Sequence, residues 1–172
     1  MSVVATNAKE PEDRSWFRIL LMRLLAETGI TQYFLATRAH LAKTTLNKLV
    51  NGRRSPTEAQ ALQTGAGIVC SDAELELMQT LLDARRNKKA GPALTTMMSS
   101  TKTSSADLAR ATRIGERIIK AFVGGELAPT EAEILRLFVA AAVRDARVEL
   151  INTLLEAARY HTIVRNVGDS AV

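Results

Sequence analysis

The chain contains an internal duplication. When the sequence is shifted by 73 residues, residues 31–86 align without a gap with residues 104–159, and 18 of these 56 pairs are identical. The same tetrapeptide, Pro-Thr-Glu-Ala, begins at Pro56 and again at Pro129. Most apolar positions that differ between the copies stay apolar, so the two copies share a core pattern and are expected to share a fold.

Composition indicates that this shared fold is helical. The 172 residues include 26 Ala and 21 Leu but only seven aromatic residues, so helix formers are abundant and strand formers are scarce. We therefore predict an all-α protein of two tandem five-helix domains, over residues 14–86 and 87–160. Loose tails are expected at 1–13 and 161–172.

Apolar spacing and breaker residues place the helices of the first unit. A stripe of apolar side chains predicts a helix over 16–27 that ends at Gly29, where glycine suits a left-handed cap. Short helices are expected over 32–39 and 42–51. After a loop, a fourth helix opens at Pro56 or Thr57, and a Ser-x-x-Glu capping box at Ser71 opens the fifth. The second unit repeats this plan.

Simple residue counts argue against several classes of function. The apolar run 137–143 is far shorter than the ~20 residues of a membrane span, and the first residues have no leader character, so a bacterial cytoplasmic location at the nucleoid is expected. One Cys and two His cannot supply an all-nitrogen and sulfur zinc site, so no metal or other cofactor is expected. No nucleophile, base and oxyanion cluster is evident, and the chain is not expected to be an enzyme.

One segment of the first unit has the pattern of a DNA-binding motif. Its features are a Leu-Ala pair, an apolar turn residue, two apolar residues three apart and a closing Asn-Gly, which here are Leu35, Ala36, Leu41, Leu46, Leu49, Asn51 and Gly52. The segment resembles the helix-turn-helix of the Cro/C1-type (XRE) phage-repressor family, whose fold is that of the lambda repressor. The resemblance covers about residues 15–70 and, more weakly, 90–143. It implies double-stranded DNA as the partner.

The resemblance also assigns roles to residues of the first unit. Base edges would be contacted by residues of the second helix of the motif, namely Lys43, Thr44, Thr45, Asn47 and Lys48. Phosphates would be held by flanking residues, namely Gln32, Arg38, Asn51, Arg53 and Arg54. The family usually has glycine at the turn, where this chain has His40 and, in the second unit, Arg113, so both residues would have to adopt a positive φ.

The two units differ in charge where DNA would bind. Residues 31–57 hold five basic residues and no acidic one, whereas four basic residues meet three acidic ones in 104–130. The base-contacting positions of the second unit would be Glu116, Arg117 and Lys120. One possibility is that this unit recognises a different base sequence, with Glu116 accepting a hydrogen bond from cytosine N4 and Arg117 contacting guanine. The other is that it has become a dimerisation or partner domain.

Apolar residues late in the chain allow two further interpretations. Leu137, Phe138, Ile151 and Leu154 belong either to the private core of the second unit or to a homodimer seam. The whole pattern favours a sequence-specific transcriptional regulator of a phage or mobile element, a repressor in preference to an activator, with RNA polymerase or another protein as a second partner. The alternative is a protein-binding module, such as an antitoxin or anti-regulator, that grips a partner with its helical repeats.

Overall fold

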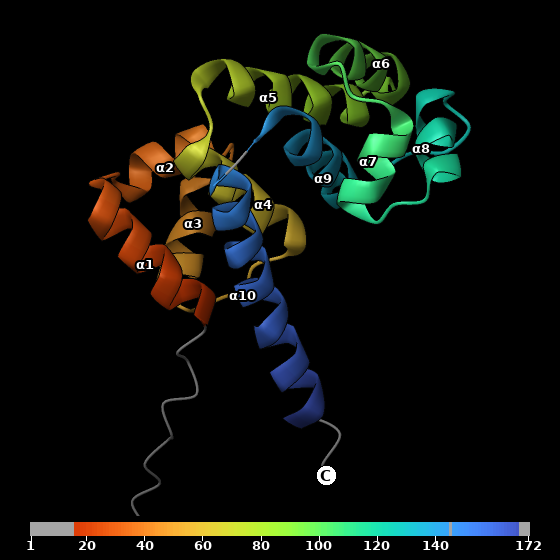
Figure 1. Cartoon of the computed structure of the whole chain (residues 1–172). Coiled ribbons are helices and arrows are strands. Elements are labelled where there is room, and N and C mark those ends of the chain that lie inside the picture. Colours follow the sequence, from red (N-terminus) through yellow and green to blue (C-terminus); the bar gives the residue numbers. More distant parts are fainter. Residues whose placement is uncertain (1–15, 145, 169–172) are drawn as a thin grey trace, which may run out of the picture.

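The described part of the chain is built from α-helices. The computed structural model describes residues 16–144 and 146–168, which form ten helices and no strand (Figure 1). They are α1 (Trp16–Thr28), α2 (Gln32–Arg38), α3 (Lys43–Val50), α4 (Glu58–Val69), α5 (Asp72–Arg86), α6 (Ala90–Thr101), α7 (Ser105–Thr112), α8 (Glu116–Val123), α9 (Glu131–Ala142) and α10 (Ala146–Gly168). The prediction of an all-α fold is confirmed. None of these helices alone could cross a membrane; α1 and α2 pass such a test only as a pair, bent by 102°.

Local side-chain chemistry explains where several helices begin and end. Thr57 Oγ1 accepts a hydrogen bond from the backbone N–H of Gln60, and Gln60 Oε1 accepts one from the N–H of Thr57, both at 3.1 Å. This capping box satisfies two N–H groups that the first turn of α4 leaves without helical partners. The predicted box at Ser71 opens α5, and Gly29 ends α1 with a φ of +68°.

Helices and turns of the second half recur at the interval of the sequence repeat. The bounds of α8 and α9 lie 73 residues after those of α3 and α4. Left-handed residues recur at the same interval, in the pairs Gly29 and Lys102, His40 and Arg113, and Gly52 and Gly125. In these segments, residues that lie 73 positions apart in the sequence therefore have the same backbone conformation.

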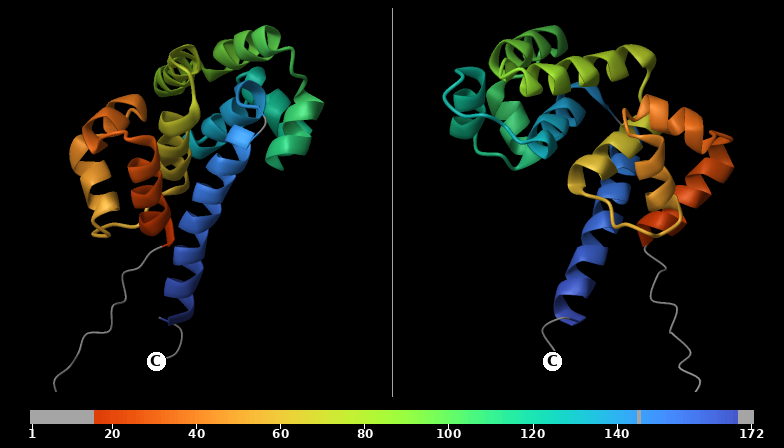
Figure 2. Two further views of the ribbon diagram at one scale, coloured as in Figure 1. Left: turned by 60° about the vertical axis from the view of Figure 1, so that its left-hand side comes forward. Right: turned by 180° about the vertical axis from the view of Figure 1, so that it is seen from behind.

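The two halves of the chain exchange their last helices, so that the last helix of each half packs on the other half. α5 packs mainly on α6 and α9, whereas α10 packs mainly on α1 and α4 (Figures 1 and 2). The first lobe therefore consists of α1–α4 and α10, and the second lobe of α5–α9. The expected units, 14–86 and 87–160, differ from these lobes by the exchange. α10 also remains helical to Gly168, where a tail was expected from 161, and the expected tail at 1–13 lies outside the described residues.

A glycine in α4 allows α10 to pack closely in the first lobe. A Cβ at Gly65 would lie 3.0 Å from Cγ1 and 3.3 Å from Cα of Ile151. Contacts this short leave no room for a side chain on α4. The position 73 residues later holds Phe138, which is fully buried in α9.

The residues expected to form a homodimer seam lie in the interior of the single chain. The four residues assigned to it, Leu137, Phe138, Ile151 and Leu154, are all 0% exposed within the single chain. α9 contributes its residues to packing against α4 and α5, and α10 contributes its residues to packing against α1 and α4. Leu137 and Phe138 on α9 lie in the second lobe, whereas Ile151 and Leu154 on α10 complete the first lobe. The apolar periodicity marks a face that is covered but does not say which helix covers it.

Ion pairs join α4 and α5 to the last two helices. The carboxylate of Glu58 on α4 accepts a hydrogen bond from Arg136 on α9 and lies 3.5 Å from Nη2 of Arg159 on α10. Glu74 on α5 pairs with Nη1 of Arg147 at 3.0 Å. The hydrogen bond from Arg136 is the main cause that lowers the pKa of Glu58 below its ordinary value. These pairs tie together helices that are far apart in sequence.

Candidate nucleic-acid interface

α2 and α3 form a helix pair on the first lobe. Leu35 and Ala36 of α2 and Leu46 and Leu49 of α3 are buried. α2 packs against α3 and α4, and α3 also packs against α1. The buried faces of both short helices are thus anchored to the core of the lobe, which leaves their opposite faces exposed.

The turn after α2 has the geometry expected from the sequence. His40 adopts a φ of +52° and its N–H donates to the carbonyl of Thr37, while the N–H of Leu41 donates to the carbonyl of Ala36 at 3.0 Å. These bonds form a Schellman-type cap with histidine in the position that usually holds glycine. Arg113 has a φ of +59° at the end of α7, so the positive φ predicted for both residues is confirmed.

Most predicted contact residues of the first unit lie on this exposed surface. Lys43, Thr44, Asn47, Lys48, Gln32, Asn51, Arg53 and Arg54 are exposed, and Thr45 is partly buried. Among the salt bridges of the described residues, none involves Lys43, Lys48, Arg53 or Arg54. The surface formed by α3 and the loop after it therefore carries cations whose charge is not neutralised by an ion pair.

Two asparagines on this surface are hydrogen-bonded to each other. Nδ2 of Asn51 donates to Oδ1 of Asn47 at 2.9 Å. Because a carbonyl oxygen has two lone pairs, Asn47 keeps one acceptor site and both N–H donors for another partner. The bond reduces the rotational freedom of the Asn47 side chain, whose amide lies on the exposed side of α3.

Arg38, which was expected to hold a phosphate, does not belong to the exposed set, because its guanidinium is hydrogen-bonded within the chain. Its Nε donates to the carbonyl of Gly67 at 2.9 Å, Nη1 donates to Oδ1 of Asp72 at 2.6 Å, and Nη2 donates to the carbonyl of Cys70. The side chain is only 18% exposed. Its donors close the corner between α4 and α5, where helix-end carbonyls need partners. Burial at this corner raises the pKa of the Cys70 thiol to about 11.

Two exposed aromatic side chains were missed by the sequence analysis. Tyr33 and Phe34 stand in the first turn of α2 and are 63% and 52% exposed. Nζ of Lys43 lies 3.6 Å from the centroid of the Tyr33 ring, and the Arg38 guanidinium lies 5.6 Å from that of Phe34. The sequence held one signal of these exposed rings. Two adjacent aromatic residues precede a basic helix in a chain that has only seven aromatic residues.

The corresponding surface of α7 and α8 is balanced in charge. Glu116 and Lys120, both assigned to base contacts, pair with each other at 2.8 Å, and Asp107 pairs with Arg110. Arg117 is exposed on α8. Two apolar side chains, Ile118 and Leu127, are 43% and 49% exposed nearby in sequence. This surface therefore differs from that of α2 and α3 in both charge and polarity.

Comparisons with known proteins agree with the character of the first lobe. A family model described as helix-turn-helix matches residues 21–63, from within α1 into α4. The match includes α2, the turn at His40 and α3, and it indicates a DNA-binding regulator of this type. Neither the curated proteins nor the solved structures gave a match to the chain.

Proposed function

We propose that this chain is a sequence-specific, double-stranded DNA-binding transcriptional regulator whose α3 enters the major groove. The observation that carries the proposal is the exposed, unneutralised basic surface of α3 within the segment that matches the helix-turn-helix model. By resemblance, the setting is a bacterial phage or mobile element, the site of action the nucleoid, and repression is favoured over activation. RNA polymerase is a further expected partner.

The geometry of α3 suits direct recognition of bases. An α-helix with its side chains is about 10–12 Å across, which fits the major groove, about 12 Å wide. Lys43 and Asn47 lie one turn apart and are both exposed. An ammonium donates to guanine O6 and N7, whereas an asparagine amide pairs with adenine through two hydrogen bonds. Arg53 and Arg54, just beyond α3, would hold phosphates.

The test is selection from a random duplex pool, followed by gel shifts at about 150 mM salt. Lys43→Ala or Asn47→Ala should cost about 1–3 kcal/mol on the selected site and relax the preference at one base pair. Arg53→Ala should weaken binding to all sequences alike, because a phosphate contact carries no base information. Failure of the wild-type chain to enrich any sequence would contradict the proposal.

We propose that α7 and α8 form a second helix-turn-helix unit, so that one chain carries two linked DNA-binding units. Glu116, Arg117 and Lys120 would then contact a second half-site. A second candidate is a surface for a protein partner or for a second copy in a homodimer, and it is supported by the exposed Ile118 and Leu127 and by the ion pair within α8. Arg117→Ala distinguishes the two, since only a DNA-reading α8 would lose preference at bases flanking the α3 site.

A further inference from the structure

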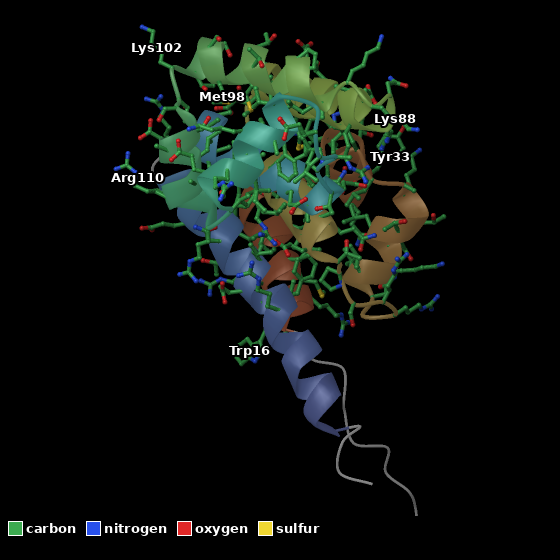
Figure 3. The ribbon with its side chains drawn as sticks, turned by 90° about the vertical axis from the view of Figure 1, so that its right-hand side faces the viewer. Trp16, Tyr33, Lys88, Met98, Lys102 and Arg110 are labelled. Atoms are coloured by element: carbon green, nitrogen blue, oxygen red, sulfur yellow. The ribbon has the colours of Figure 1, made fainter. Side chains whose placement is uncertain are left out.

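Tyr33 and Lys43 form a contact between the two helices of the proposed DNA-binding motif. Tyr33 is the second residue of α2 and Lys43 is the first residue of α3. The ammonium of Lys43 lies over the face of the Tyr33 ring, 3.6 Å from its centroid. The ring lies at the outer side of α2 (Figure 3), so the contact is made on the surface.

The contact restricts a side chain that is otherwise flexible. A lysine has four rotatable bonds, and an exposed ammonium samples many directions. A cation over an aromatic face at an exposed site is favoured by about two- to fivefold in population. The ring therefore biases Lys43 toward one direction from the N-terminus of α3 before any partner is bound, which reduces the entropy lost on binding.

The neighbouring aromatic provides a matched contrast. Phe34 also faces a cation, but the Arg38 guanidinium is already held by carbonyls at the corner between α4 and α5. Phe34 thus contacts a structural arginine, whereas Tyr33 contacts a lysine that forms no salt bridge in the described part of the chain. The positions equivalent to Tyr33 and Lys43 in the second half are Ala106 and Glu116, which cannot make this contact.

We infer that Tyr33 is a positioning residue for DNA specificity, acting through Lys43. Its ring holds the ammonium in the direction in which it donates to guanine O6 and N7 in the major groove. This inference rests on the proposed function, because it assigns to Tyr33 the orientation of a proposed base-contacting side chain. It predicts that the preference at one base pair depends on an aromatic ring that need not contact that base pair itself.

The experiment compares the full-length chain with Tyr33→Ala, Tyr33→Phe and Phe34→Ala on the selected duplex and on its single-base variants. Tyr33→Ala should lower affinity for the selected duplex about two- to fivefold and reduce discrimination at the Lys43 base pair by the same factor. Tyr33→Phe keeps the ring face and should retain wild-type discrimination. Phe34→Ala should leave discrimination at that base pair unchanged. Thermal unfolding of each variant shows whether the fold is intact.

A double-mutant cycle with Lys43→Ala separates positioning from a direct contact. If Tyr33 acts through Lys43, Tyr33→Ala has no further effect once Lys43 is alanine. Additive losses, or equal losses on the selected duplex and on random DNA, would overturn the inference while leaving the proposed function standing. If the wild-type chain selects no sequence, the proposed function itself fails, and the two failures are thus distinct.

Discussion

Two equivalent helix corners, one in each lobe, are built by different means. Where α1 meets α3, Nε of Arg18 donates to the carbonyl of Val50 at 2.9 Å. In the second lobe Gly91 of α6 takes the place of Arg18, and a Cβ there would lie only 2.6 Å from the carbonyl oxygen of Val123. A long donor spans the first corner, whereas close backbone contact forms the second. Equivalent positions can therefore keep a helix arrangement while the contacts that stabilise it change.

The exposed faces of the two helix pairs differ in the same way. On α3 the first residue, Lys43, contacts Tyr33 and forms no salt bridge with any described residue. On α8 the first residue, Glu116, is neutralised by Lys120. The buried residues maintain a common backbone, and the surface residues decide what each face can bind.

Removing α10 should unfold the first lobe. Ile151, Leu154 and Leu155 are buried against α1 and α4, and burial of such side chains contributes about 1.5–3 kcal/mol each, a large part of the roughly 5–15 kcal/mol that stabilises a domain. A chain ending at Arg144 should lose cooperative thermal unfolding of this lobe, measured by circular dichroism, and should lose DNA binding. A chain ending at Gly168 is the control. Cooperative unfolding of α1–α4 without α10 would show that the exchange is dispensable.

Gly91→Ala should destabilise the protein by about 1–3 kcal/mol, because the new methyl group meets a backbone carbonyl that cannot move independently. Arg18→Ala is the matched change in the other corner and should cost about 1 kcal/mol for the lost hydrogen bond. Urea denaturation measures both. A Gly91→Ala chain as stable as the wild type would mean that α6 can shift away from α8.

Exchanging the first residues of α3 and α8 should move DNA affinity in opposite directions. Lys43→Glu places a carboxylate in the groove and should weaken binding to the selected duplex by at least about tenfold. Glu116→Lys removes an acidic group and should strengthen binding to random DNA by a few-fold through phosphate attraction. Gel shifts at two salt concentrations measure both. A Glu116→Lys chain with unchanged affinity would indicate that α8 lies away from the DNA.

The smallest expected effect concerns the ion pair between α4 and α9. The hydrogen bond from Arg136 lowers the folded-state pKa of Glu58 below 4.5, so this carboxylate stabilises the fold above that pH and loses its contribution as the pH falls through the folded-state pKa. Glu58→Gln should cost at most about 1 kcal/mol at neutral pH, since the pair is partly exposed. The stability difference from the wild type should vanish in acid. A constant difference across this range would contradict the assignment.

Local features were predictable from the sequence because they depend on neighbouring residues. The capping box at Ser71 and the left-handed conformations of Gly29 and His40 follow from short-range hydrogen bonds and backbone sterics. The exposed side of α3, with Lys43 and Asn47, follows from helical periodicity. Neither periodicity nor the family resemblance distinguishes a free cation from one used internally, so the internal hydrogen bonds of Arg38 could not be predicted.

The all-helical class, the approximate helix boundaries of the first unit and the surface that carries the basic charge follow from the sequence alone, since each is set by residues within a few positions of one another. The exchange of α5 and α10, the closure of the corner between α4 and α5 by Arg38 and the contact of Tyr33 with Lys43 emerge only in the folded chain. These contacts depend on which apolar faces meet in space. Several partners satisfy the same apolar pattern, and close approaches such as that of Gly65 to Ile151 select among them.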